Sequence, residues 1–264
     1  MRANSIRQII ASGQPVVNGW LAIPSSYSAE IIGHQGFDSV TVDLQHGMIG
    51  IDAALPMFQA LSATPAIPLA RVPWNDPAQI MRLLDSGAYG IICPMISTVD
   101  DAVSFVSSCR YPPHGQRSFG PARAMLYGGA DYYPYADKEI LALGMIETQA
   151  GLDNLEKILA IEGLDGIYVG PNDLALALGS VPKSESDDPV VTKAIEHIRQ
   201  RAIAHGKIAG IFCSSGEAAA MRIKQGFQMV TPGNEAGLMA SAAKAAVATA
   251  KGAQASSSPS KTGY

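Results

Sequence analysis

Eight short apolar segments, each followed by a helical pattern, place the strongest constraint on the fold of this chain. They are rich in Val, Ile, Leu and Ala and are bounded by Gly, Pro or polar residues, which is typical of strands buried in a parallel sheet. We expect strands at Val16–Leu21, Ser39–Leu44, Ala66–Ala70, Gly90–Pro94, Leu141–Ile146, Gly166–Val169, Ile208–Phe212 and Gln228–Thr231. The helical patterns lie at Ala29–Gly33, Ile51–Ala63, Pro77–Ser86, Val99–Cys109, Gly151–Ala160, Val190–His205, Gly216–Gln225 and Glu235–Ala250.

Strict alternation of this kind over 264 residues predicts an α/β fold, the closed (β/α)8 barrel of TIM type. A doubly wound open sheet is the competing architecture, but no Gly-rich dinucleotide fingerprint follows the first strand. We expect one barrel domain over residues 1–251, with an extra amphipathic helix within Met1–Ala11, and a disordered polar tail over residues 252–264. The segment Tyr111–Tyr135 is rich in Pro, Gly, Tyr and Arg and is predicted to be a long irregular loop.

Composition excludes several classes of protein. The net charge is −4, the pI is near 5.7 and no basic patch stands out, so nucleic acid is not an expected partner. No apolar stretch is long enough to span a membrane. The three cysteines, Cys93, Cys109 and Cys213, show neither a disulfide framework nor metal-ligand spacing, and the N-terminus does not read as a signal peptide. These features predict a cytoplasmic protein whose cysteines are small buried hydrophobes.

Two carboxylates follow neighbouring strands. Glu147 comes directly after Leu141–Ile146, and Asp173 follows Gly166–Val169 after a Gly-Pro-Asn turn. Parallel strands end at the same edge of a sheet, so we expect the two side chains to meet there. Paired oxygen ligands of this kind suit a divalent cation such as Mg²⁺ or Mn²⁺. The simpler alternative is that each carboxylate caps the helix that follows it.

Further polar groups lie near predicted strand ends, where barrels keep their active sites. Asp43, Gln45 and His46 accompany the second strand, Arg71 follows the third, and Asp85 lies just before the fourth. We expect all of them on one rim. No lysine lies at a strand end on that rim, which argues against Schiff-base chemistry and favours a metal for polarising a carbonyl group.

Each of these residues also has a structural interpretation. Alone, His46 would more often be a satisfied structural histidine, and Arg71 could be a surface or ion-paired arginine. Trp20 is expected to line the pocket floor or to pack rather than react. Arg117 and Arg123 are interpreted as solvated loop charges. Four residues near the last two strand ends either bind phosphate or cap helices: Ser214, Ser215, Gly233 and Asn234.

Six ordered motifs resemble the HpcH/HpaI aldolase family, class II metal-dependent pyruvate aldolases related to 4-hydroxy-2-oxoheptanedioate aldolase. The resemblance extends from about Ser5 to Ala250. Its motifs are Val42-Asp-Leu-Gln-His-Gly47, Leu69-Ala-Arg-Val-Pro73, Leu84-Asp-Ser-Gly-Ala88, Tyr111-Pro-Pro-His-Gly-Gln-Arg117, Met145-Ile-Glu-Thr148 and Gly170-Pro-Asn-Asp-Leu174.

The resemblance implies a barrel of the phosphoenolpyruvate/pyruvate type and a role for each matching residue. Glu147 and Asp173 would bind a divalent metal (Mg²⁺, Mn²⁺ or Co²⁺). Arg71 would bind the keto oxygen, and His46 would act as acid and base with Asp85 as its orienting carboxylate. The backbone amides of Asn172 and Asp173 would hold the substrate carboxylate, which also agrees with the attraction of helix N-termini for anions.

The family is also typically hexameric, with exchange of the C-terminal helix, here Glu235–Ala250. This sequence departs from it at Met145, where some members carry Gln, and at Ala175 and Ala177, where hydroxyl residues are common. Methionine donates no hydrogen bond, so positioning of pyruvate would differ or use a water. Ser118–Ala124 is expected near the aldehyde site.

These features together predict an enzyme that cleaves 4-hydroxy-2-oxo acids reversibly to pyruvate, or a similar 2-oxo acid, and an aldehyde. One alternative is an oxaloacetate decarboxylase that uses the same enolate chemistry. A second alternative is a non-catalytic protein that binds 2-oxo acids.

Overall fold

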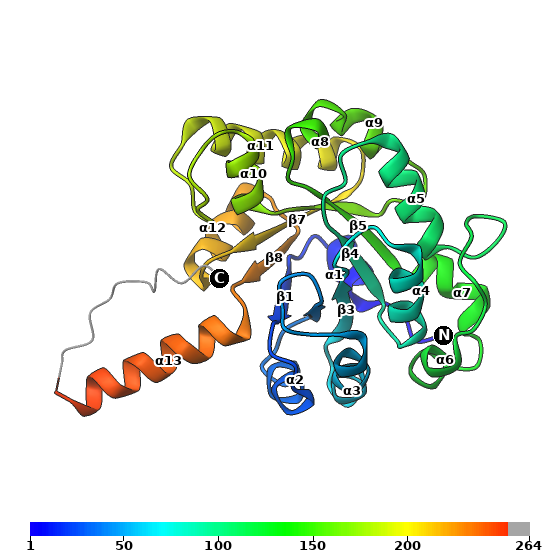
Figure 1. Cartoon of the computed structure of the whole chain (residues 1–264), viewed down its shortest axis with the longest axis horizontal. Coiled ribbons are helices and arrows are strands. Elements are labelled where there is room, and N and C mark those ends of the chain that lie inside the picture. Colours follow the sequence, from blue (N-terminus) through cyan, green and yellow to red (C-terminus); the bar gives the residue numbers. More distant parts are fainter. Residues whose placement is uncertain (253–264) are drawn as a thin grey trace.

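A closed parallel barrel in the order β1-β2-β3-β4-β5-β6-β7-β8 forms the centre of the molecule (Figure 1). The structure is a computed structural model that describes residues 1–252. Its strands are β1 Val16–Leu21, β2 Ser39–Asp43, β3 Ile67–Arg71, β4 Gly90–Cys93, β5 Leu141–Ile146, β6 Gly166–Val169, β7 Ile208–Cys213 and β8 Met229–Pro232. The expected (β/α)8 barrel is confirmed, and no strand bound differs from the sequence prediction by more than one residue.

Helices alternate with the strands and surround the barrel (Figure 1). They are α1 Ser5–Ala11, α2 Ser26–Gly33, α3 Ile51–Leu61, α4 Pro77–Asp85, α5 Val99–Cys109, α6 Ala122–Gly128, α7 Tyr132–Glu139, α8 Gln149–Asp153, α9 Leu155–Leu159, α10 Pro171–Ala177, α11 Pro189–Ala204, α12 Gly216–Gln225 and α13 Glu235–Ala250. The extra N-terminal helix is confirmed as α1. Within residues 1–252, the helices lack the combination of length and apolar character that a membrane span requires.

Two expectations about the helices need correction. The helix expected over Gly151–Ala160 is two short helices, α8 and α9, which meet at Asn154. The segment predicted as an irregular loop, Tyr111–Tyr135, contains α6 and the start of α7. The tail expected to be disordered lies, apart from Gly252, outside the described residues.

Polar side chains fill part of the barrel interior below the C-terminal ends of the strands. Asn18 donates from Nδ2 to Thr41 Oγ1 at 3.0 Å and to Thr231 Oγ1 at 2.9 Å. The hydroxyl groups of Tyr168 and Thr231 lie 2.6 Å apart. Because each of these buried groups has a partner, the layer is stable without water, and it forms a rigid floor beneath the strand ends.

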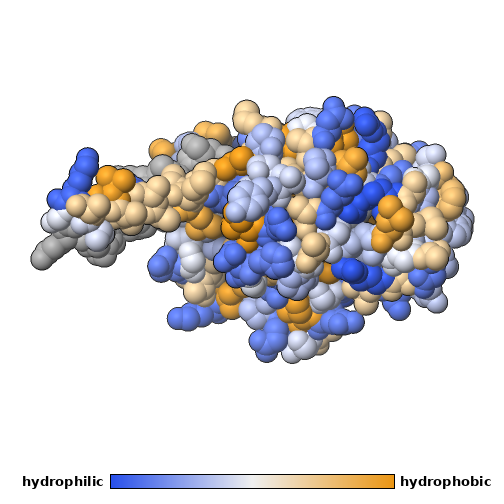
Figure 2. Space-filling view, turned by 90° about the horizontal axis from the view of Figure 1, so that it is seen from below, coloured by the Kyte–Doolittle hydropathy of each residue, from blue (hydrophilic) through white to orange (hydrophobic). Residues whose placement is uncertain are grey.

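The last helix, α13, points away from the barrel (Figure 1). Of its residues only Glu235 is buried. Glu235 accepts hydrogen bonds from the backbone amides of Ala22 and Ile23, which attaches the start of the helix to the end of β1. In Figure 2 the projecting helix presents a mostly apolar surface to solvent. Its exposed large apolar side chains are Leu238, Met239 and Val247.

Candidate active site

Arg71 ends β3 and is held against Asp43, which ends β2. The two residues are register partners in the parallel pair. Arg71 donates from Nε to Asp43 Oδ1 at 2.7 Å and from Nη2 to Asp43 Oδ2 at 2.6 Å, and both side chains are buried. This is a bidentate contact between a guanidinium and a carboxylate, which fixes the orientation of the Arg71 side chain and balances its charge. Arg71 is therefore ion-paired, one of the two possibilities that the sequence left open.

Trp20 of β1 completes this arrangement. Its Nε1 donates to Asp43 Oδ2 at 3.1 Å, and the Arg71 guanidinium carbon lies 4.8 Å from the centre of its ring. Phe212 packs edge-on against the indole at 5.4 Å between ring centres. Trp20 is almost fully buried and lines the pocket, so it holds both members of the ion pair.

Asp43 stays ionised despite its burial. Burial alone would raise its pKa, but the hydrogen bonds and charge of Arg71, with smaller contributions from Trp20 and the Gln45 amide, hold the pKa of Asp43 below its usual value. The backbone N–H of His46 also points to Asp43, at 3.3 Å from Oδ1. Asp43 thus orients the loop that carries His46.

Glu147 follows β5 and is buried, with an exposed fraction of 2%. Its Oε1 accepts a hydrogen bond from the Met95 amide at 2.9 Å. Met95 has a φ of +59°, a left-handed conformation that is uncommon outside glycine. The strained backbone after β4 therefore presents an N–H group that sets the direction of the carboxylate.

Glu147 and Asp173 interact electrostatically, as the sequence pattern suggests. Burial, aided by the negative charge of Asp173, raises the pKa of Glu147 to about 7 against the opposing effects of the Met95 hydrogen bond and the charge of Arg71. A β-carbon on Gly170 would lie 2.2 Å from Glu147 Oε2, so a larger residue here would displace this carboxylate from the turn that leads to Asp173. Asp173 itself lies in the first turn of α10 and is exposed.

One pocket brings five of the expected or notable residues together: Trp20, Arg71, Met145, Asn172 and Asp173. No lysine lines it. Asn172 Oδ1 accepts a hydrogen bond from Ser184 Oγ at 3.4 Å. Met145 contributes its apolar side chain to the pocket.

Asp85 lies at the other end of the barrel. It is the last residue of α4, and because α4 runs antiparallel to the strands its C-terminus lies beside the strand starts. There Asp85 Oδ1 accepts a hydrogen bond from Arg117 Nη2 at 2.7 Å. His46 follows β2 at the strand ends, so the expectation that both residues share one rim of a single chain does not hold.

Several alternative interpretations are decided by the contacts. The residues that cap α8 and α10 are Thr148 and Gly170, so neither Glu147 nor Asp173 serves as a helix cap. Ser215 and Asn234 do cap α12 and α13, whereas Ser214 donates to Glu185.

The two loop arginines that were interpreted as solvated are instead hydrogen-bonded to the protein, so that interpretation is wrong. Arg117 is buried and contacts Asp85, Tyr111 and Tyr132. Arg123 donates to Ser62, Phe58 and Ser86. The three cysteines are free and buried, as expected.

The donor set suits a hard divalent cation. Within residues 1–252 no group of three or more His, Cys, Asp or Glu side chains is placed to hold a metal. Two carboxylates beside an open pocket nevertheless match the binding mode of Mg²⁺, which commonly takes one or two carboxylates and completes its shell with substrate and water. Burial is the main cause of the raised pKa of Glu147, with a smaller contribution from the charge of Asp173, and a cation held between the two carboxylates would lower it.

Comparison with known proteins identifies the family. The model of the HpcH/HpaI aldolase/citrate lyase family matches residues 18–242. The chain belongs to this family. It is accordingly an enzyme of the aldolase and lyase type that acts on small molecules.

Relatives and solved structures agree with this assignment over almost the whole chain. A hydroxypyruvate/pyruvate aldolase of Rhizorhabdus wittichii is 40% identical over 248 residues, which covers 94% of this chain and 99% of that protein. A 5-keto-4-deoxy-D-glucarate aldolase of Escherichia coli is 39% identical and covers 90% of this chain and 93% of its own. The crystal structure of an HpcH/HpaI aldolase/citrate lyase family protein from Burkholderia cenocepacia superposes with a TM-score of 0.88 at 29% identity, covering 94% and 100% of the two chains.

Two functional contacts were not predicted from the sequence. Asp43 is the partner of Arg71 because the two residues are paired in the register of β2 and β3. An acidic and a basic residue at the ends of two adjacent predicted strands could have indicated this pair from the sequence. The Met95 amide could not be found, because a backbone N–H becomes a specific donor only through a local conformation that Met does not favour.

Proposed function

We propose that this enzyme is a divalent-metal-dependent aldolase that cleaves 4-hydroxy-2-oxo acids reversibly to pyruvate, or a similar 2-oxo acid, and an aldehyde. The relative named hydroxypyruvate/pyruvate aldolase supports the substrate class. The observation that carries the proposal is the buried Glu147, which faces the charge of Asp173 close to Arg71.

Glu147 and Asp173 would hold the metal, with Mg²⁺, Mn²⁺ and Co²⁺ as candidates. When bound, the ion polarises the keto carbonyl of the substrate and stabilises the negative charge that develops on its oxygen. The backbone amides of Asn172 and Asp173, in the first turn of α10, would bind the substrate carboxylate.

Arg71 supplies a fixed positive charge to the pocket. Asp43 and Trp20 hold its guanidinium in one orientation, so little reorganisation is needed when charge develops on the enolate. In the cleavage direction a base removes the proton of the 4-hydroxyl group, the C3–C4 bond breaks and the aldehyde leaves. The enolate then takes a proton at C3 to give the 2-oxo acid.

His46 is the proposed acid and base for these proton transfers. It follows β2 on the catalytic rim, and its imidazole is exposed. Asp85 lies at the opposite end of the same barrel, so an orienting His46–Asp85 pair can form only between two copies of the chain. We therefore propose a homo-oligomer, a hexamer by family likeness, in which α13 packs on another copy. We also place the enzyme in the cytoplasm, in keeping with its free cysteines.

Proton exchange at the methyl group of pyruvate tests the proposal directly. With Mg²⁺ or Mn²⁺ in D₂O, the wild-type protein should exchange these protons, because enolate formation precedes carbon–carbon bond formation. The Glu147→Gln variant keeps the shape of the side chain and an acceptor for the Met95 amide, but it loses the charge. We expect it to exchange at least 10²-fold more slowly, as loss of a preorganised charge does.

The matched control is Glu30→Gln, which changes an exposed carboxylate on α2. It should exchange at the wild-type rate. Pyruvate that binds without metal-dependent exchange would instead indicate a non-catalytic binding protein. Exchange accompanied by CO₂ release from oxaloacetate, with no cleavage of any hydroxy-oxo acid, would indicate the decarboxylase.

A further inference from the structure

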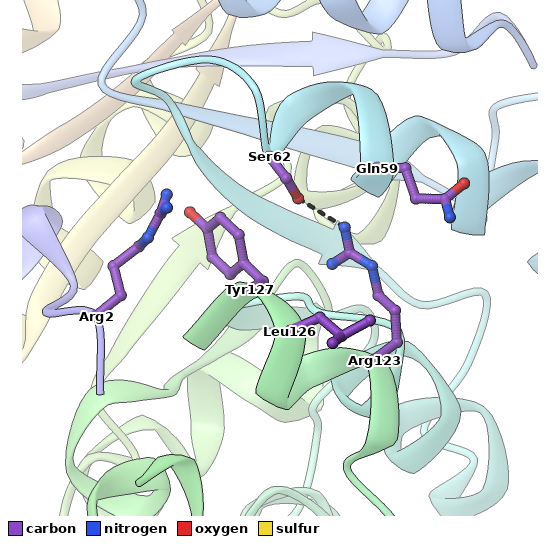
Figure 3. A pocket seen from close by; sticks show the side chains of 6 residues that line it. All are labelled: Arg2, Gln59, Ser62, Arg123, Leu126 and Tyr127. Carbon is purple, nitrogen blue, oxygen red and sulfur yellow. Dashed lines mark hydrogen bonds between the residues drawn. The ribbon is translucent and has the colours of Figure 1, made fainter. Parts of the chain in front are cut away.

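A second pocket lies at the end of the barrel opposite the proposed active site. We call it the arginine pocket (Figure 3), and its lining residues are Arg2, Gln59, Ser62, Arg123, Leu126 and Tyr127. Gln59 and Ser62 belong to the C-terminal end of α3, and the last three belong to α6. Because α3 runs antiparallel to the strands, its C-terminus lies beside the strand starts, and the pocket is separate from the catalytic rim.

Both arginines of this pocket lack an acidic partner. Arg123 donates from Nη1 to the Ser86 carbonyl at 3.0 Å and from Nη2 to Ser62 Oγ at 2.6 Å, and these partners are neutral. Arg2 lies over the Tyr127 ring, 4.2 Å from its centre. The ion pairs formed within residues 1–252 include neither arginine. The pocket therefore carries two positive charges without a countercharge.

The phenol of Tyr127 gives an independent indication of a ligand. Its exposed fraction is 6%, and its ring packs edge-on against Tyr89 at 5.0 Å. Its hydroxyl group is buried beside the Arg2 guanidinium, which can only donate, and no described residue accepts the phenol proton. In Figure 3 this hydroxyl points toward Arg2, whereas Ser62 lies on the other side of the ring and is bonded to Arg123. Buried hydroxyl groups are nearly always hydrogen-bonded, so an absent partner at this position is expected to come from outside the chain.

We propose that the arginine pocket binds an oxyanion group, a phosphate or a carboxylate, of a small molecule. The donors that line it are the two guanidinium groups and the Tyr127 hydroxyl, because the Ser62 hydroxyl already donates to the Phe58 carbonyl. Guanidinium groups match both kinds of anion. The bound anion links the N-terminal segment through Arg2 to α3 and α6. The site is remote from the strand ends of its own barrel, and its occupancy stabilises the barrel by joining these elements.

Calorimetric titration of the full-length, metal-loaded enzyme tests this site, with inorganic phosphate and succinate as separate probes at constant ionic strength. We expect saturable binding of at least one probe. Saturation by phosphate alone identifies a phosphate site, and saturation by succinate alone identifies a carboxylate site. Arg2→Gln should weaken binding at least tenfold, and Tyr127→Phe should weaken it roughly tenfold, because each removes one donor to a charged group.

Arg82→Gln is the matched control, since it removes an exposed arginine of α4 outside the pocket, and it should bind the probe like wild type. Aldol cleavage measured without added anion should be unchanged in Arg2→Gln, whose side chain is exposed and distant from the catalytic rim. The proposal is overturned if neither probe binds saturably, or if wild type, Arg2→Gln and Tyr127→Phe bind with equal affinity.

Discussion

Asp43 accepts hydrogen bonds from the side chains of Arg71 and Trp20 and from the backbone of the His46 loop. It determines where the positive charge of Arg71 points. An ionised carboxylate suits this position because it accepts hydrogen bonds at both oxygens from several donors at once. The orientation of Arg71 is therefore a property of β2 and β1 as much as of β3.

Asp43→Asn should lower both stability and activity. The amide nitrogen of Asn cannot accept the hydrogen bonds that one carboxylate oxygen now takes, and the buried Arg71 would lose the countercharge of Asp43. We expect a loss of about 3–5 kcal/mol in the free energy of unfolding and a fall of about 10²-fold in kcat/KM, as misplaced catalytic groups produce. Trp20→Phe removes only the Nε1 donor and should cause a smaller loss in both. Wild-type kcat/KM in Asp43→Asn would exclude the positioning role.

Glu147 makes the stability of the metal-free protein depend on pH. Its pKa is about 7 in the folded protein and its ordinary value is 4.5, so the native state holds the proton more tightly than the unfolded chain does. Stability contributed by the neutral carboxyl group is therefore complete below about pH 4.5 and is lost as pH rises toward 7. The loss is at most about 3 kcal/mol, since each pKa unit corresponds to about 1.4 kcal/mol.

Urea unfolding in EDTA at several pH values measures this effect. Glu147→Gln should be about as stable as wild type at pH 4.5 and more stable than wild type at pH 8, because the amide carries no charge. Glu30→Gln, at an exposed position, should follow the wild type throughout. Parallel pH profiles for wild type and Glu147→Gln would show that Glu147 ionises in the fold as it does in water.

At the scale of elements, the strands were predictable and the short helices were not. A strand such as β6 is a continuous apolar run between Gly and polar residues, so local sequence determines it. By contrast, α6 and α7 contain Pro, Gly and several Tyr and lack a helical apolar period. They are supported by contacts distant in sequence, such as the buried Arg117 between Asp85 and Tyr132. Such contacts depend on the assembled barrel.

The same distinction applies to the candidate site. Residues placed by strand ends, such as Arg71 and Glu147, could be located from the βα alternation alone. Asp85 was assigned to the wrong rim. It was grouped with residues at the C-terminal ends of strands, but it ends α4 and therefore lies beside the start of β4. In each βα unit the helix runs antiparallel to its strand, so the C-terminal end of the helix lies at the rim where the strands start.

At the scale of the whole molecule, residues 1–252 bury only the first residue of α13, Glu235, against the end of β1. This helix has 16 residues, many of them alanine, and such a helix is only marginally stable alone in water. Leu238, Met239 and Val247 have exposed fractions of 43%, 61% and 53%. A helix of this kind is expected to pack against another copy, with Glu235 as the fixed point from which it extends.

Met239→Glu combined with Val247→Glu should therefore reduce the mass of the assembly. Each substitution places a charge on an apolar surface that the oligomer would bury. Light scattering coupled to size-exclusion chromatography measures the mass, and Lys244→Gln on the same helix is the control. A wild-type protein that is monomeric at micromolar concentration would contradict the assembly outright.

Assembly also has a catalytic consequence, because His46 and Asp85 lie at opposite ends of one barrel. If the pair forms between copies, His46→Ala and Asp85→Asn should each be weakly active alone, yet dissociating and reassembling them together should restore activity. A mixed interface can join the intact His46 of one variant to the intact Asp85 of the other. The restored activity should disappear when Met239→Glu and Val247→Glu are present in both chains. Mixtures no more active than the separate variants would show that Asp85 does not complete a site across copies and serves only to hold Arg117.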